Sequence, residues 1–169
     1  MKKLLFILLC AYVFIGCMGG GTHGSIECYQ YQVPKSDLEK AVGKVISTIP
    51  TIKQDSVKDY YNDDTTYVTI KVIEKKDTNE YIFRYGGGKE YWVSSKVSSI
   101  FIAYAHNKEG RGGSSGNGGV KWYNFKLKEE LTGVFERGFI EKIDQELKIK
   151  HTECNVSAPP TTSQIIIQN

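Results

Sequence analysis

The order of apolar and polar residues along the chain predicts two amphipathic helices. In residues 34–49 the apolar residues share one face of a helix: Leu38, Ala41, Val42, Val45, Ile46 and Ile49. Pro50 ends this segment, because proline cannot continue a helix. In residues 128–150 a second apolar stripe has the same spacing: Leu131, Val134, Phe135, Phe139, Ile143 and Leu147. Both stripes are expected to pack against a common core.

Between the two helices, the pattern changes to short runs rich in β-branched and aromatic residues. Four of these runs predict strands, at residues 67–74, 80–85, 97–105 and 120–127, and residues 90–93 are a further short candidate. The runs are separated by turn residues rather than by helices, which favours antiparallel pairing. We therefore expect an α+β fold, a two-layer sandwich of a four-stranded antiparallel meander with one helix before it and one after it in the sequence.

The first residues have a different pattern. Lys2 and Lys3 precede an apolar run over residues 4–15, and a small residue, Gly16, then precedes Cys17. This order is typical of an export signal, and the run is shorter than the ~20 residues that span a bilayer. Such a signal, with a cysteine at its cleavage site, either directs attachment of a lipid to that cysteine or is an ordinary secretory signal that has a cysteine there by chance.

Gly16-Cys17 after the apolar run resembles the lipobox of bacterial lipoproteins, although Phe14 stands where leucine is commonest. The resemblance covers residues 1–17 and implies that Cys17 carries the lipid and begins the mature chain. Met18 is not the aspartate that retains enteric lipoproteins at the inner membrane, and residues 19–25 contain no acidic residue of the kind that resembles a surface-export signal. The resemblance thus implies an outer-membrane protein facing the periplasm, held to the membrane by its N-terminal lipid.

These boundaries divide the chain into a signal peptide (1–16), a tether (17–25), a single domain (26–156) and a polar tail (157–169) expected to be disordered. Within the tail, residues 165–167 are three isoleucines, which either pair with a sheet edge or are an irregular terminus. Removing the first 16 of 169 residues leaves 153, a length that suits one domain.

Charge and cysteine content narrow the possible partners and sites. Loss of the signal lowers the net charge from +3 to +1, which disfavours nucleic acid as a partner. Cys10 leaves with the signal and Cys17 would carry lipid, so Cys28 and Cys154 remain as a pair in an oxidising compartment, where a disulfide is expected. The alternatives are two free thiols or a metal pair, but no CxxC or HxxxH spacing predicts a metal site.

No motif predicts catalysis or a cofactor. The glycine-rich residues 110–119 lack the lysine of a phosphate-binding loop, and they are expected to form a flexible hairpin loop. His23, His106 and His151 have no acidic or cysteine neighbour at a spacing typical of a triad or a metal site. Neither GxSxG nor SxxK occurs, so no residue is predicted to be catalytic.

Aromatic residues are abundant in the predicted sheet. Sheet packing is the ordinary explanation, but tyrosine and tryptophan also give rigid contact area to binding surfaces. The candidate binding residues are Tyr81, Tyr85, Tyr91, Trp92, Arg111 and Trp122. The sequence therefore favours a lipid-anchored, non-enzymatic protein-binding lipoprotein of the cell envelope, such as an immunity or inhibitor protein or a subunit of an envelope complex. The alternatives are a small envelope hydrolase and a lipoprotein that binds an apolar ligand or a glycan.

Overall fold

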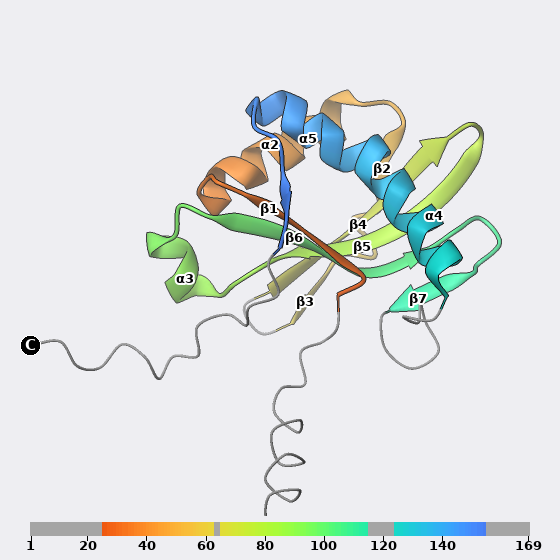
Figure 1. Ribbon diagram of the computed structural model, residues 1–169, viewed down its shortest axis with the longest axis horizontal. Helices are drawn as coiled ribbons and strands as arrows, with labels where there is room; N and C mark the ends of the chain where they lie inside the picture. Colours follow the sequence, from red (N-terminus) through yellow and green to blue (C-terminus); the bar gives the residue numbers. More distant parts are fainter. Residues whose placement is uncertain (1–24, 63–64, 115–123, 155–169) are drawn as a thin grey trace, which may run out of the picture.

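The computed structural model describes residues 25–62, 65–114 and 124–154. These residues form an antiparallel sheet of eight strands, with the long helices on one of its faces (Figure 1). The strands are β1 (Glu27–Tyr31), β2 (Ile52–Gln54), β3 (Tyr60–Asn62), β4 (Thr65–Glu74), β5 (Asp77–Tyr85), β6 (Ser98–His106), β7 (Gly112–Ser114) and β8 (Thr152–Glu153).

The strand order in the sheet is β2-β4-β5-β6-β1-β8. The three longest strands, β4, β5 and β6, form its centre, and β3 extends the pairing of β4 while β7 pairs with the far end of β6. A tight turn joins β4 to β5, where Lys75 and Lys76 both have positive φ, 50° and 75°. Such a turn matches the twist of a two-stranded hairpin.

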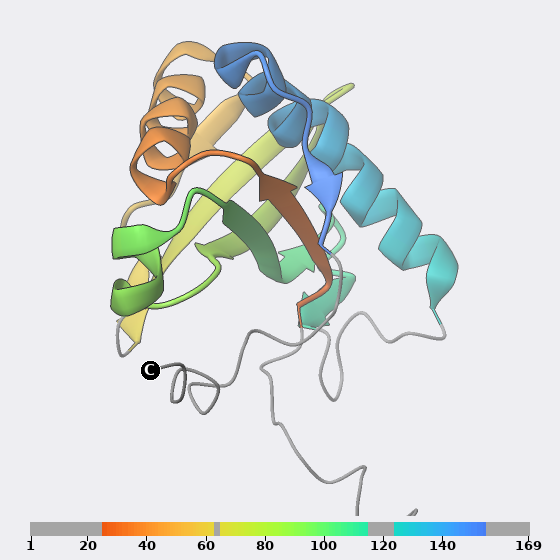
Figure 2. The same ribbon diagram turned by 60° about the vertical axis from the view of Figure 1, so that its left-hand side comes forward.

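Two long helical segments cover one face of the sheet. They are α2 (Lys35–Thr48) and a continuous run of α4 (Phe125–Phe135), a π-helical turn η1 (Glu136–Ile140) and α5 (Glu141–Leu147). Figure 2 shows both on the same side of the strands, and Lys44 of α2 is joined to Glu146 of α5 by an ion pair of 2.7 Å. The apolar stripes of both helices enter one core with the inward-facing residues of the sheet.

The mixed α+β class is confirmed, but the four-stranded meander is not. The sheet has eight strands, five of which are additional to the three central strands β4, β5 and β6. The predicted strands at 67–74, 80–85 and 97–105 correspond to β4, β5 and β6, and both predicted helices are present. The candidate strand at 90–93 is wrong, since it lies in a short helix, α3 (Lys89–Ser94). The strand at 120–127 is wrong from Phe125 onwards, where α4 begins.

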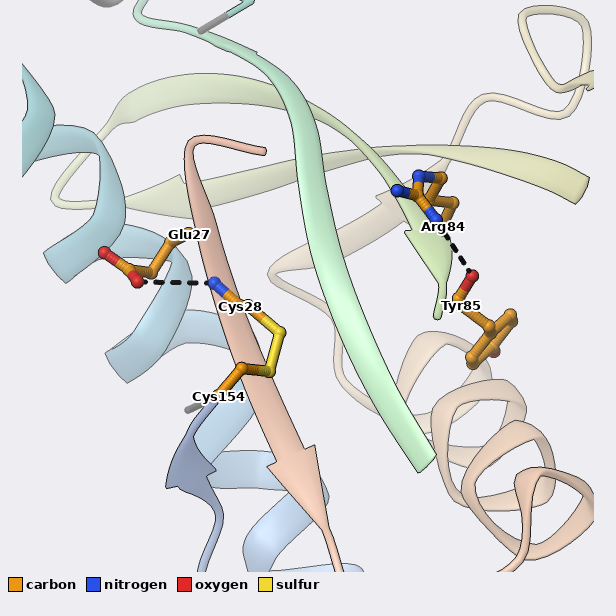
Figure 3. Close-up of a disulfide and its surroundings, with 5 residues drawn as sticks. All are labelled: Glu27, Cys28, Arg84, Tyr85 and Cys154. Atoms are coloured by element: carbon orange, nitrogen blue, oxygen red, sulfur yellow. Dashed lines mark hydrogen bonds between the residues drawn. A yellow bond between two sulfur atoms is a disulfide. The ribbon is translucent and has the colours of Figure 1, made fainter. Parts of the chain in front are cut away.

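The disulfide between Cys28 and Cys154 is confirmed, with a Cα–Cα distance of 5.5 Å (Figure 3). Cys28 lies in β1, and Cys154 directly follows β8, which pairs with β1. Cys17, Trp122 and residues 165–167 lie outside the described residues, as do the signal, most of the tether and the tail.

Candidate functional site

The two faces of the sheet have different surroundings. Side chains alternate between the faces along each strand. Tyr81, Phe83 and Tyr85 of β5 are buried against the helices, so Glu80, Ile82 and Arg84 point to the opposite side. We call that side the open face, because the two long helices both lie on the other one (Figures 1 and 2).

The register places the open-face residues in rows that run across the strands. One row, which we call the aromatic row, contains Tyr60 of β3, Tyr67 of β4, Arg84 of β5 and Phe101 of β6. On the next strand, β1, Cys28 is the residue that pairs with Phe101. A second, the charged row, contains Lys71, Glu80 and His106. Between them lie Thr69, Ile82 and Tyr104.

Ring faces and one guanidinium form the aromatic row. Tyr60 and Tyr67 are stacked, with ring centroids 4.4 Å apart and planes 5° from parallel. The guanidinium carbon of Arg84 lies 4.8 Å from the centroid of the Phe101 ring, within the range of a cation–π contact. The aromatic row therefore crosses four neighbouring strands, β3, β4, β5 and β6.

The Phe101 ring occupies the space that a side chain at position 86 would fill. A Cβ built on Gly86 would overlap the ring of Phe101 and the hydroxyl of Ser99. The ring on which Arg84 lies therefore packs directly over the backbone at this position. A side chain on residue 86 would have to displace the ring, and the guanidinium with it.

Arg84 has few protein partners. Its Nη1 donates a long hydrogen bond of 3.5 Å to the carbonyl of Tyr85 (Figure 3). Among the described residues, no carboxylate lies within ion-pair distance of its guanidinium. Its charge is therefore not balanced by this part of the chain.

In the charged row, the carboxylate of Glu80 is paired with basic side chains of the same sheet and of a neighbouring loop. Glu80 is only 8% exposed, and Lys58 donates to its two carboxylate oxygens at 2.9 and 2.8 Å. His106 Nε2 lies 3.2 Å from the same carboxylate, and Lys71 Nζ lies 3.9 Å from it. Burial alone would raise the pKa of Glu80, but the hydrogen bonds from Lys58 and His106 outweigh it, so the pKa is lowered.

The loop that carries Lys58 is fixed to β4. Asp59 accepts a hydrogen bond of 2.6 Å from the backbone N–H of Thr69, and the Thr69 hydroxyl donates to the carbonyl of Lys58 at 3.2 Å. Thr69 is fully buried under this loop although it belongs to the open face. Lys58 is thus held over Glu80 from the edge of the sheet.

The groups of the charged row are engaged with one another. The Nδ1 of His106 lies 3.2 Å from the carbonyl oxygen of Asn107, and its Nε2 faces Glu80. A general base needs a nitrogen or oxygen within reach of a substrate proton. In this arrangement both ring nitrogens of His106 already face acceptors, so the cluster holds the strands and the loop together.

Tyr81 and Tyr85 do not belong to a binding surface. Tyr81 is fully buried and its hydroxyl donates a 2.9 Å hydrogen bond to the carbonyl of Leu131, while Tyr85 is 7% exposed. Burial raises the pKa of both phenols. The prediction that these two residues contact a partner is therefore wrong, because they lie on the helix-covered face.

The other predicted residues lie at separate places. Trp92 of α3 donates a 2.6 Å hydrogen bond to the carbonyl of Gly86, and Lys35 Nζ lies 3.9 Å from its ring centroid, whereas the neighbouring Tyr91 is 41% exposed. Arg111 is exposed and paired with Glu109 at 3.0 Å, in an open groove of about 530 Å³ beside α4. The predicted residues that the structure describes therefore do not form one surface.

On β5, the residues predicted to bind a partner were Tyr81 and Tyr85, which both lie on the helix-covered face. Glu80, Ile82 and Arg84 alternate with Tyr81, Phe83 and Tyr85 in the sequence, which already predicts a second face. The pairing of Arg84 with Phe101 could not be predicted, because a β-bulge between Ile82 and Phe83 shifts the register with β6.

Comparisons with protein-family models, curated proteins and solved structures find no match to this chain. In the described part of the chain, no helix is both long and apolar enough to cross a membrane, and no three acidic, histidine or cysteine residues are grouped to hold a metal ion.

Proposed function

We propose that this protein is a lipid-anchored, non-enzymatic lipoprotein that binds another protein through its open face. The observation that carries the proposal is the aromatic row, with Arg84 lying on the Phe101 ring beside the stacked Tyr60 and Tyr67. Tyrosine and arginine are enriched among the residues that dominate protein interfaces, because they provide large, rigid contact area and directional hydrogen bonds. Tyr104, which is 37% exposed, extends the area available to a partner.

The anchor in this proposal is lipid on Cys17, and the location is the outer membrane, facing the periplasm. Support comes from the Gly16-Cys17 sequence and from the oxidised Cys28–Cys154 pair, which fits an exported protein. A tether over residues 17–25 spans at most ~30 Å, at about 3.3–3.6 Å per residue. The partner would therefore lie close to the membrane surface, as an envelope-complex subunit or a protein neutralised by an immunity or inhibitor protein would.

The alternatives have less support. A hydrolase needs an acid and a base available to a substrate, whereas Glu80 and His106 are engaged with each other. An apolar ligand would not suit the groove beside α4, which is lined by charged residues such as Glu74, Lys108 and Arg137. Glycan binding has one favourable observation, the exposed tyrosine rings on the open face, and is the second candidate.

Replacing Cys17 by serine tests the anchor. We expect the wild-type protein in the membrane fraction and the Cys17→Ser protein, once its signal is cleaved, in the soluble fraction. Protease added to intact cells should leave the wild-type protein uncut. Persistence of the cleaved variant in the membrane would contradict lipid attachment, and digestion on intact cells would contradict the periplasmic location.

Site-specific photo-crosslinking tests the binding face. A photoreactive phenylalanine replaces Tyr104 on the open face or, as a control, Tyr91 on α3, two positions of similar exposure, 37% and 41%. We expect position 104 to crosslink to a defined protein in cells and position 91 not to do so. Crosslinking from position 91 alone, or from neither position, would refute the open face as the binding surface.

A further inference from the structure

Charge is distributed unevenly over the open face. Lys58, Lys71 and His106 surround Glu80, and Lys71 also pairs with Asp55 at 3.3 Å. The charged row and its loop thus contain carboxylates for their cations. In the described residues, the aromatic row contains a cation, Arg84, and no carboxylate, and Lys53, which pairs with Lys71 in the sheet, is another open-face cation outside these ion pairs.

Arg84 is held in position before any partner arrives. Its guanidinium lies on the Phe101 ring, and the ring packs over the bare backbone of Gly86. A planar guanidinium offers a rigid fork of N–H donors that matches a carboxylate, and holding it on a ring reduces the entropy lost on binding. The hydrogen bond from its Nη1 to the Tyr85 carbonyl is long, at 3.5 Å, and uses one of these donors.

We infer that the open face binds an acidic segment of a partner protein, with an aspartate or glutamate carboxylate paired to Arg84 and its neighbours packed on the rings of Tyr60 and Phe101. The inference rests on the proposed function and specifies the chemistry of the partner. A carboxylate there removes the charge imbalance, and the aromatic surroundings exclude water and strengthen the pair.

Two other occupants fit less well. An anionic membrane surface is recognised by a cluster of unpaired basic residues. On the open face Lys58 and Lys71 are already paired to Glu80 and Asp55, and Lys53 and Arg84 lie in different rows of the sheet. A neutral glycan would stack on the rings but leave the guanidinium without a counter-charge, which is costly when water is excluded.

Peptide binding by the full-length protein in detergent micelles tests the inference. The probes are immobilised nine-residue peptides with a central aspartate or glutamate between apolar and aromatic residues, and the same peptides with asparagine or glutamine at the centre. Hydrogen bonds to charged groups discriminate by about tenfold or more, so we expect the wild type to prefer the acidic peptides by that factor. Arg84→Gln should abolish the preference, Arg84→Lys should reduce it, and Arg111→Gln, an arginine off the face, should leave it intact.

Equal binding of acidic and amide peptides by the wild type would overturn the inference, and so would a preference that survives in Arg84→Gln. Arg84-dependent binding to phosphatidylglycerol vesicles without a peptide preference would also overturn it. The melting temperature and the Cys28–Cys154 bond of each variant confirm that it is folded, and Arg84→Lys, which keeps the charge, is informative if Arg84→Gln does not fold. These results are independent of crosslinking from position 104, which tests whether the open face binds protein at all.

Discussion

At the scale of single residues, Glu80 links three separate parts of the open face. It accepts hydrogen bonds from Lys58 in the loop before β3, lies next to Lys71 of β4, and faces His106 of β6. Removing one member of such a cluster leaves the others with uncompensated charge. The carboxylate therefore contributes to stability because its cationic neighbours are already in place.

Glu80→Gln is expected to lower the free energy of unfolding at pH 7 by roughly 1–3 kcal/mol, the cost of leaving charged hydrogen-bonding groups unsatisfied. The pKa of Glu80 is lowered from 4.5, so its stabilising effect is present above about that pH and is lost as the pH falls through the lower folded-state value. Denaturant titrations of both proteins from pH 7 to pH 3 measure the difference, which should shrink below pH 4.5. Glu109→Gln, in the exposed pair with Arg111, serves as the control, and a difference independent of pH would contradict this role of Glu80.

At the scale of elements, the turn η1 brings the long C-terminal helix close to the sheet. A Cβ on Gly138 would overlap a methyl group of Val72 on β4, so glycine is required where the helix crosses this strand. The residues Phe139 and Ile140 of the same turn are fully buried in the core. The sequence alone gives no reason for a glycine at position 138 of a helix, because the contact of this residue with β4 depends on the tertiary fold.

Gly138→Ala is expected to destabilise the protein by roughly 1–3 kcal/mol through overpacking against Val72. Gly133→Ala is the matched control on the same helix: its Cβ would meet only the flexible end of Arg137, at 3.0 Å, so helix propensity should make it neutral or slightly stabilising. Thermal and denaturant unfolding of the two variants measure the difference. The double variant Gly138→Ala with Val72→Ala should cost less than the sum of the single changes, whereas additive effects would show that the two residues do not interact.

The length of each helix or strand decides whether the sequence could predict it. Residues 34–49 and 128–150 have long periodic stripes, and β4, β5 and β6 are long enough to show alternation, so these elements were found. The strands β2, β3, β7 and β8 have two or three residues each and owe their existence to the neighbour they pair with. Residues 90–93 include Tyr, Trp and Val, which favour a strand by propensity. In the structure they form part of a helix, in which the Trp92 ring lies against Lys35 and its N–H donates a hydrogen bond to the carbonyl of Gly86. These contacts come from the tertiary fold and are not visible in the local sequence.

At the scale of the whole molecule, the C-terminal segment joins the two layers. His151 lies between Asp144 and Glu136 of the long helix, with Nδ1 2.9 Å from Asp144 and Nε2 3.4 Å from Glu136. The chain then pairs with β1 through β8 and is bridged to Cys28. Because Cys28 and Cys154 are 126 positions apart, the bridge encloses nearly all of the described fold in one loop. This bond was predicted because Cys28 and Cys154 remain as a pair once Cys10 and Cys17 are excluded, whereas the histidine contacts that hold the same segment were not predicted.

Replacing both Cys28 and Cys154 by serine should therefore lower the free energy of unfolding by up to about 4–5 kcal/mol, the chain-entropy value for a loop of this size. The sheet and helices should remain, because β8 and the contacts of His151 still hold the C-terminal segment, so circular dichroism at 25 °C should be unchanged. Denaturant unfolding of the wild type with and without reductant, beside the double variant, measures the loss. Reductant should destabilise the wild type and leave the double variant unaffected. Alkylation of the denatured wild-type protein without reductant should label neither cysteine, and labelling of both would show that the exported protein folds without the bond.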